Sequence, residues 1–242
     1  MTGRMWLVLA LLLVLLIAIA GLWIAYFNQQ PPGFDGTALV PPDAETDFTL
    51  VDQTGHDFTL SSAKGKVVVL TFLYTHCTDV CPFIAAKLKR VQVLLGSDAS
   101  KVELVAVTVD PQRDTVDRVA IYSQQFGLSE SWHFLTGNES QLQPIWRAYY
   151  VGSNVGPEEG GPTNVAPGPV PAGTLQATGL DNGLNSAEIA LAQKVITTFG
   201  GGYEVTHSTP IWLIDPAGNV RVSTHEYASP EEIVHDIRLL LP

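Results

Sequence analysis

Residues 66–82 read KVVVLTFLYTHCTDVCP, an apolar stretch that leads into two cysteines and a proline. The first nine residues are nearly all apolar and rich in β-branched types, which is typical of a strand buried on both faces of a sheet. Beyond Pro82, apolar residues recur every three or four positions, and this spacing predicts a helix over 82–95. A buried strand followed by a helix is characteristic of α/β domains.

The same strand and helix patterns continue on both sides of this stretch. We expect a β-hairpin at 47–60, strands at 102–109 and 132–135, helices at 115–126, 139–150 and 186–199, a second hairpin at 211–223 and a last helix from 229. This order predicts a central sheet with helices on both faces, in the arrangement of a thioredoxin-like fold with additions. Pro210 sits where that fold places a cis-proline, so a cis bond there is a hypothesis.

Glycine and proline interrupt the pattern between residues 152 and 183, where eight glycines and five prolines occur in 32 residues. This composition predicts a loop. Together with the helix at 186–199, it forms an insertion at about 151–202 within a domain that spans 47–242. The sequence predicts no role for this insertion.

The amino-terminal segment carries an apolar run of 23 residues, 5–27, which only Gly21 interrupts. A helix of this length spans about 30 Å of hydrocarbon, so residues 1–27 are predicted to be an uncleaved transmembrane anchor. A signal peptide cleaved after Ala20 is the alternative. Arg4 precedes the run, and a positive end stays in the cytoplasm, so either interpretation exports the domain.

A mitochondrial presequence would be rich in arginine, and this amino-terminal segment is not. We therefore expect the domain to lie on the extracytoplasmic side of a bacterial plasma membrane. Residues 28–46 contain four prolines and no periodicity, which predicts a tether between anchor and domain. Thirteen basic against 24 acidic residues give a formal net charge of −11. Such a chain offers no basic patch to neutralise phosphates, so nucleic-acid binding is excluded as a first hypothesis.

The chain contains two cysteines, Cys77 and Cys81, and both lie between the buried strand and its helix. Pro82 suits the first turn of a helix, so Cys81 lies near the positive helix end, where the pKa of a thiol falls. Two thiolates select Cu(I), Zn or an Fe–S cluster over hard cations. A local disulfide of an exported protein and a redox-active dithiol remain open as alternatives.

A metal site needs a further ligand, and methionine is excluded outside the apolar run because both methionines precede residue 6. His207 lies just before the strand at 211–214, in a loop that abuts the dithiol helix in a thioredoxin-like sheet. His207 is therefore the best third ligand, with His76 and His225 as lesser candidates. Of the remaining histidines, His56 is expected in a hairpin turn, His133 packed at the start of a strand, and His235 solvated on the final helix.

Four segments, taken in order, resemble the SCO/SenC family of membrane-anchored copper-binding assembly proteins of cytochrome c oxidase. The resemblance covers about residues 45–150 and 200–241, together with the apolar run. The span between Tyr150 and Tyr203 is longer than the family leads us to expect. The four segments are FLYTHCTDVCP at 72–82, VTVDPQRDT at 107–115, FLTG at 134–137, and 203–218, which includes YEVTHS and WLIDPAG.

This resemblance implies that Cys77, Cys81 and His207 bind copper, with Cu(I) held by the thiolates and Cu(II) tolerated through the imidazole. Asp79, between the cysteines, and Asp110, in an Asp-Pro loop, correspond to acidic residues of the family. Asp79 could orient the loop, tune its charge or cap the helix, and capping is the simplest of these. Turn and cap roles explain Asp110 and Asp114 at least as well as a role in docking a partner does, with Thr115 as the alternative cap.

Two functions follow from this set of residues. The first is a metallochaperone, not an enzyme, that delivers copper to the dinuclear copper site of a cytochrome c oxidase subunit. Its further partners would be other copper chaperones or thiol reductants. The second is a thiol–disulfide oxidoreductase with Cys77 and Cys81 as catalytic residues, which keeps the copper-site cysteines of the oxidase reduced. The C-x-x-x-C spacing and His207 favour the first.

Overall fold

The computed structural model describes residues 2–28, 33–154, 179–199 and 205–242. It divides into two units, Met1–Gly33 and Phe34–Pro242. The first unit contains helix α1 (Thr2–Asn28). A search of the described residues finds no helix with the length and hydropathy needed to cross a membrane. The predicted anchor at 1–27 is therefore not shown and stays a prediction.

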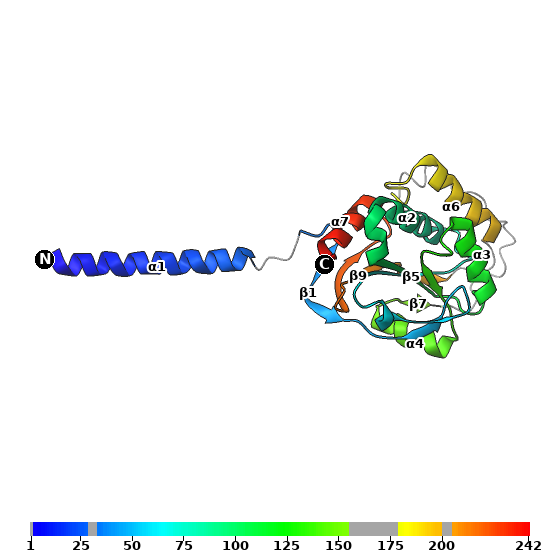
Figure 1. The fold of residues 1–242 in the computed structure, drawn as a ribbon, viewed down its shortest axis with the longest axis horizontal. Helices are drawn as coiled ribbons and strands as arrows, with labels where there is room; N and C mark the ends of the chain where they lie inside the picture. The colour runs from blue at the N-terminus through cyan, green and yellow to red at the C-terminus, as the bar shows by residue number, and fades with distance from the viewer. Residues whose placement is uncertain (1, 29–32, 155–178, 200–204) are drawn as a thin grey trace. The chain divides into compact units, whose positions relative to one another are not determined.

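The second unit is built on a six-stranded mixed sheet with the order β1-β10-β9-β4-β5-β6 (Figure 1). β4, β5 and β6 run parallel, whereas β9, β10 and β1 pair antiparallel with their neighbours. All seven residues of β4 are buried, which explains its unbroken apolar sequence and confirms the predicted strand. The strands are β1 (Thr37–Ala44), β4 (Val67–Leu73), β5 (Val102–Thr108), β6 (His133–Leu135), β9 (Ile211–Ile214) and β10 (Asn219–Thr224).

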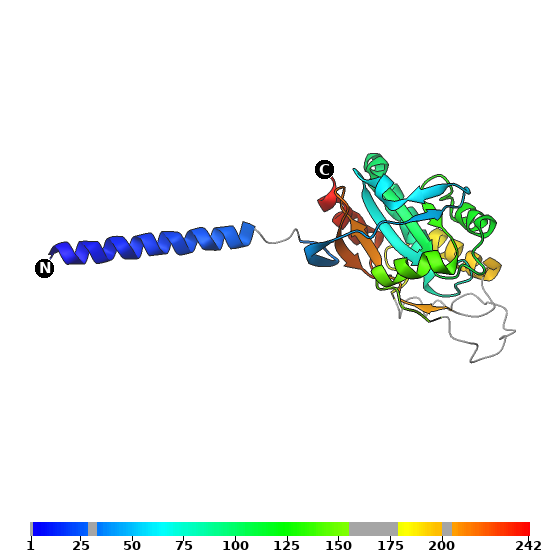
Figure 2. The same cartoon turned by 90° about the horizontal axis from the view of Figure 1, so that it is seen from below.

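Helices cover both faces of this sheet (Figures 1 and 2). α2 packs against α6 and α7 on one face, and α4 covers the opposite face (Figure 1). The right-handed crossovers from β4 to β5 and from β5 to β6 place α2 and α3 on the same face. The predicted mixed α/β fold with a central sheet is confirmed. The helices are α2 (Val80–Leu95), α3 (Val116–Phe126), α4 (Glu139–Ala148), α6 (Ser186–Phe199) and α7 (Pro230–Leu240).

Smaller elements complete the unit. The predicted amino-terminal hairpin consists of β2 (Thr49–Val51) and β3 (Asp57–Thr59). A second pair, β7 (Ser153–Asn154) and β8 (Thr206–His207), was not predicted, since two-residue strands show no periodicity. Two short 3-10 helices follow β3 and α2: η1 (Leu60–Ala63) and η2 (Gly96–Lys101).

Local capping signals set the helix boundaries. The Ser229 hydroxyl accepts the amide of Glu232, and the Glu232 carboxylate accepts the amide of Ser229, so a capping box begins α7. The Thr115 side chain accepts the amide of Arg118 at the start of α3, so Thr115 is the cap and Asp114 is not. Such signals are local in sequence, which is why these boundaries could be predicted.

The prediction of a tether over 28–46 is wrong for its second half. Residues 37–44 form β1, which pairs with β10 at the edge of the sheet. Pro41 and Pro42 lack the backbone N–H that an interior strand needs, but an edge strand tolerates prolines. Most of β1 is exposed, so it carries no alternation of apolar and polar residues.

Two further predictions concern the insertion and Pro210. The helix predicted within the insertion is confirmed as α6, whereas positions 155–178 and 200–204 of the insertion lie outside the described residues. The cis peptide bond in the described residues precedes Pro41, so the hypothesis of a cis bond before Pro210 is wrong.

Candidate metal centre

The two cysteines lie at the point where the sheet changes direction. The chain continues from β4 to β5 and β6 on one side, and returns as β9 and β10 on the other side. In open α/β sheets, ligands bind beyond the carboxyl end of a strand at such a switch point. Cys77 follows β4 in the connecting loop, and Cys81 is in the first turn of α2.

Both cysteines are buried and both are free thiols. Cys77 is 4% exposed and Cys81 is 0% exposed. The backbone amide of Cys81 donates to Cys77 Sγ at 3.4 Å, which brings the first sulfur to the amino-terminal end of α2. The structure therefore presents a dithiol and not the local disulfide that the sequence had left open.

The thiols of this pair differ in acidity. Burial raises the pKa of Cys77, but hydrogen bonds from the Cys81 thiol and from the amides of Cys81 and Asp79 outweigh it, so the pKa is lowered. Burial also raises the pKa of Cys81, and the bond it donates to Cys77 raises it further. Cys77 is therefore the more acidic thiol of the pair, and Cys81 holds its proton more strongly.

Of the roles considered for Asp79, the structure rules out capping of α2 by its side chain. It occupies the position before α2, but its side chain makes no capping hydrogen bond. Its backbone amide instead bonds to the sulfur of Cys77 and helps to lower the pKa of that thiol. The loop turns its amides toward Cys77, and the carboxylate is left exposed. The capping role predicted for Asp79 is wrong.

Asp114 belongs to this site, a role that the sequence did not predict for it. Its carboxylate accepts the Thr75 hydroxyl and the Thr108 hydroxyl, each at 2.6 Å, and also the amide of Thr75. Thr75 stands two positions before Cys77, so Asp114 fixes the start of the cysteine loop to the end of β5. Burial, with a contribution from Asp110, raises the pKa of Asp114 to about 6. Only its place beside Thr115, as a possible cap, had drawn attention to it.

Asp110 is 2% exposed and forms an ion pair with Arg113. The amide of Asp110 donates to the Thr108 hydroxyl at 2.9 Å, which fixes the turn after β5. The Arg113 guanidinium lies over the ring of Tyr74, 5.8 Å from its centroid. The predicted turn role of Asp110 is confirmed, and the same residue holds an arginine against the cysteine loop.

His207 lies in β8, where it pairs with Ser153 of β7. The position of its side chain is outside what the structure describes, so its role as third ligand stays a prediction. The backbone leading to it is placed, because the amide of Val205 donates to the Tyr74 hydroxyl at 3.3 Å. The structure thus brings the chain just before His207 to the residue that opens the cysteine loop.

His76, the lesser candidate beside Cys77, is engaged elsewhere. Its Nε2 lies 3.1 Å from Arg118 and its Nδ1 lies 3.2 Å from the Thr75 hydroxyl. Burial and the charges of Arg113 and Arg118 lower the pKa of His76 to about 4. A neutral imidazole with both nitrogens occupied is poorly suited to replace His207.

Comparison with known proteins identifies this arrangement. A model of the SCO1/SenC family matches residues 37–166, which is more than half of the chain. The chain belongs to the SCO1/SenC family. The matched residues contain the cysteine loop, Asp110 and Asp114.

Curated relatives of this SCO1/SenC chain come from animals and bacteria. The mitochondrial SCO2 homolog of Bos taurus is 36% identical over 115 residues, which cover 47% of this chain and 42% of that protein. The SCO1 protein homolog of Bacillus subtilis is 31% identical over 98 residues, which cover 40% of this chain and 51% of that protein. The chain therefore matches about half of the length of these relatives, or less.

Solved structures of the family share the fold over a larger part of the chain. ScoI of Bradyrhizobium japonicum, solved with copper bound, aligns with a TM-score of 0.59 and 25% identity over 82% of this chain and 99% of that one. A SCO1/SenC family lipoprotein from Bacillus anthracis aligns with a TM-score of 0.59 and 24% identity over 85% and 100%. The mixed α/β fold of this SCO1/SenC chain is that of the solved SCO proteins.

Two further histidines of this SCO1/SenC chain, His225 and His235, contact residues outside the cysteine loop. His225 is exposed and accepts the amide of Tyr227 at 3.2 Å. His235 Nδ1 lies 3.1 and 3.2 Å from the carboxylates of Asp35 and Asp236, and these three ligand atoms lie close enough together to hold a cation. Asp236 already accepts the amides of Asp35 and Gly36, so the group clamps the start of the domain onto α7.

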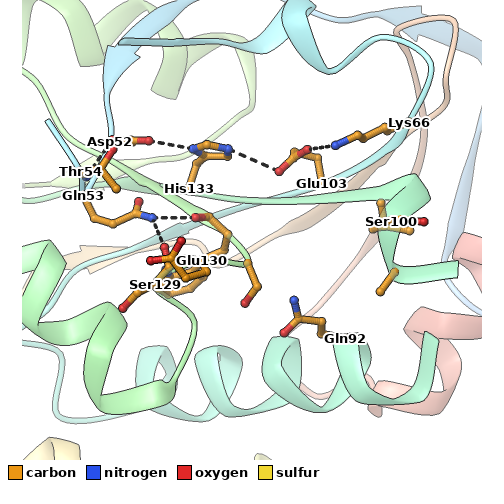
Figure 3. Close-up of a pocket in the computed structure, with 14 residues that line it drawn as sticks. Asp52, Gln53, Thr54, Lys66, Gln92, Ser100, Glu103, Ser129, Glu130 and His133 are labelled. Atoms are coloured by element: carbon orange, nitrogen blue, oxygen red, sulfur yellow. Dashed lines mark hydrogen bonds and ion pairs between the residues drawn. The ribbon is translucent and has the colours of Figure 1, made fainter. Parts of the chain in front are cut away.

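A polar cavity of about 460 Å³ lies at the other end of the parallel strands of this SCO1/SenC domain (Figure 3). His133 joins two carboxylates along its wall: Nδ1 lies 3.0 Å from Asp52, and Nε2 lies 3.4 Å from Glu103. Lys66 completes the row by pairing with Glu103 at 2.7 Å. The His133 ring also stacks on Phe58, with centroids 4.2 Å apart, so the predicted packing role of His133 is confirmed.

This row of charges predicts a pH dependence of stability. Burial lowers the pKa of His133, but its bonds to Glu103 and Asp52 outweigh burial, so the pKa is raised. The imidazolium is thus favoured in the folded state, and its stabilisation is present at acidic pH and lost as pH rises through the raised pKa. We expect the His133→Gln variant to lose more stability at pH 5.5 than at pH 8.5, measured as the urea midpoint. A matched His56→Gln variant should show a smaller difference, and an equal loss for His133→Gln at both pH values would contradict the prediction.

Proposed function

We propose that this chain binds copper through the thiolates of Cys77 and Cys81 and the imidazole of His207. It delivers that copper during assembly of the dinuclear copper site of cytochrome c oxidase and is not an enzyme. The observation that carries the proposal is the pair of buried free thiols at the switch point of the sheet, one with a lowered pKa. Membership of the SCO1/SenC family and the copper-bound ScoI structure support the choice of metal.

The chemistry of the pair suits Cu(I). Thiolates are soft ligands that prefer Cu(I), and burial removes the water that would compete for it. Cys77 is the thiol that loses its proton more easily, and copper takes the place of the proton on Cys81. Binding therefore releases a proton. The affinity for copper should rise with pH until the pH exceeds the pKa of both thiols. An added imidazole allows Cu(II) to be held as well.

The redox alternative is less well supported by the same geometry. A thiol–disulfide oxidoreductase must present its nucleophilic sulfur to a disulfide of a second protein. Cys77 is 4% exposed and Cys81 is fully buried, so a mixed disulfide would require the loop to open. A reduced dithiol is nevertheless a precondition of copper binding, so thiol reductants remain expected partners, alongside other copper chaperones and the oxidase subunit.

We also propose that residues 1–27 hold the domain at a bacterial plasma membrane, on the extracytoplasmic side. The apolar run at 5–27 supports this, and a SCO1/SenC relative from Bacillus anthracis is described as a lipoprotein. Carbonate washing of membranes from cells that express the full chain tests the proposal. The chain should stay in the membrane pellet, and its release into the wash would contradict the anchor.

His207→Ala tests the proposed ligand set. Removal of one of three ligands should weaken copper binding at least about tenfold, since even the loss of a group that supports a ligand costs that much. The loss should be larger for Cu(II) than for Cu(I), because the imidazole is the ligand that suits Cu(II). Competition with a chelator of known affinity measures both. The matched control is His56→Ala, which should bind as the wild type does, and an unchanged affinity in His207→Ala would remove His207 from the site.

A further inference from the structure

Tyr74 stands between the two parts of the proposed copper site. It is the first residue after β4 and is 3% exposed. Its hydroxyl oxygen accepts the amide of Val205 at 3.3 Å, and its hydroxyl proton is directed to the sulfur of Cys77. One phenol group therefore contacts a proposed copper ligand and the backbone of a segment 131 residues further along the chain.

That segment is the one that carries His207. Val205 directly precedes β8, and His207 is the second residue of that strand. The pairing of β8 with β7 ties His207 to Ser153, and the Ser208 hydroxyl donates to the carbonyl of Tyr150 at 3.2 Å. Neither of these bonds reaches the cysteine loop, whereas the Tyr74 hydroxyl relates the residue just before β8 to Cys77.

The ring that carries this hydroxyl is itself held in place. The Arg113 guanidinium lies 5.8 Å from its centroid, a cation–π arrangement, and Arg113 is paired with the buried carboxylate of Asp110. Asp110 is fixed in turn by the Thr108 hydroxyl at the end of β5. The orientation of Tyr74 is thus set by the rigid sheet and not by the cysteine loop alone.

Resting on the proposed function, we infer that Tyr74 is a positioning residue whose hydroxyl bridges Cys77 to the strand that carries His207. The bridge holds β8, the strand that carries His207, near the cysteine pair before copper arrives. Metal ligands that are held by hydrogen bonds bind more tightly, because less ordering remains to be done when the metal enters. A phenylalanine would keep the buried ring, but it could neither accept the Val205 amide nor donate to the sulfur.

A double-mutant cycle of Tyr74→Phe and His207→Ala tests the bridge in the full-length chain. Tyr74→Phe alone should weaken copper binding about fivefold, which corresponds to ~1 kcal/mol, the net contribution of one hydrogen bond. In the His207→Ala background, the same substitution should have a clearly smaller effect, because the strand then carries no ligand to position and only the bond to the Cys77 sulfur is lost. A loss of equal size in both backgrounds, or none in the wild type, would overturn the inference.

A second measurement does not depend on copper. Hydrogen exchange of the Val205 amide in the metal-free chain should be faster in Tyr74→Phe, because this amide loses its acceptor. The matched control is Tyr149→Phe, since the Tyr149 hydroxyl is also buried but donates to the carbonyl of Thr46 at 3.2 Å. Unchanged exchange in Tyr74→Phe would overturn the bridge. If the wild type retains no copper while exchange responds as expected, the proposed function fails and the bridge stands.

Discussion

Cys77→Ala and Cys81→Ala are each expected to abolish the retention of Cu(I) against a moderate competitor, whereas the wild type retains one equivalent. Each substitution leaves a single thiolate, and a single thiolate with one imidazole lacks the soft donor pair that selects Cu(I). The two variants should differ in their remaining thiol. Cys81 in Cys77→Ala keeps the proton that burial favours, so this variant should be the weaker binder at neutral pH.

Anaerobic competition between the reduced chain and a chromogenic Cu(I) chelator measures this prediction. The matched control is Thr78→Ala, which changes a residue of the same loop but removes no sulfur. Its affinity should fall far less than that of either cysteine variant, because the substitution leaves both thiols and the imidazole in place. Tight Cu(I) retention by either cysteine variant would show that the metal is bound elsewhere and would refute the dithiolate site.

Asp114→Ala is expected to lower the free energy of unfolding by about 3 kcal/mol, because it leaves several buried donors without an acceptor. The Thr75 hydroxyl, the Thr75 amide and the Thr108 hydroxyl all donate to this carboxylate. None of them can turn toward water, since Thr75, Thr108 and Asp114 are all fully buried. The loop that carries Cys77 should loosen in the same variant, and copper binding should weaken with it.

Urea unfolding of the metal-free chain measures the loss. The control is Asp117→Ala, an exposed acid in the first turn of α3, for which a change of less than about 1 kcal/mol is expected.

The pH dependence of stability gives a second test of Asp114. The folded pKa of Asp114, about 6, lies above its ordinary value of 3.8, so the carboxyl group stabilises the fold below pH 4 and this contribution is lost as pH rises through 6. Asp114→Asn should not show this loss, and a wild-type profile that Asp114→Asn reproduces would contradict the assignment.

The parts of the fold that were predicted correctly rest on signals within a few residues of one another. The unbroken apolar run of β4 marks a strand buried on both faces, and the Ser229–Glu232 capping box marks the start of α7. The edge strand β1 escaped prediction because an exposed strand with two prolines has neither alternation nor a burial signal. The pair β7 and β8 escaped it because its strands have two residues each.

The residues of the candidate site also fall into those that the sequence identifies and those that only the structure identifies. Cys77 and Cys81 could be found from the sequence because both lie in one loop, and the chemistry of a thiolate pair follows from their spacing and the helix that begins there. Asp114 and Tyr74 could not be found, since each acts on residues far along the chain or on another strand. The capping role of Asp79 was also misjudged, because its side chain makes no capping hydrogen bond and its amide bonds to the sulfur of Cys77.

The sequence by itself determined the α/β class, the position of the cysteine pair after a buried strand and the limited choice of a third ligand. Tertiary structure alone decided which thiol ionises first, because unequal hydrogen bonding within a buried pair sets that order. It also decided that Asp114 anchors the cysteine loop and that Tyr74 meets Val205. Local periodicity reports which face of an element is buried, whereas a contact between distant segments depends on how the whole sheet and its helices pack.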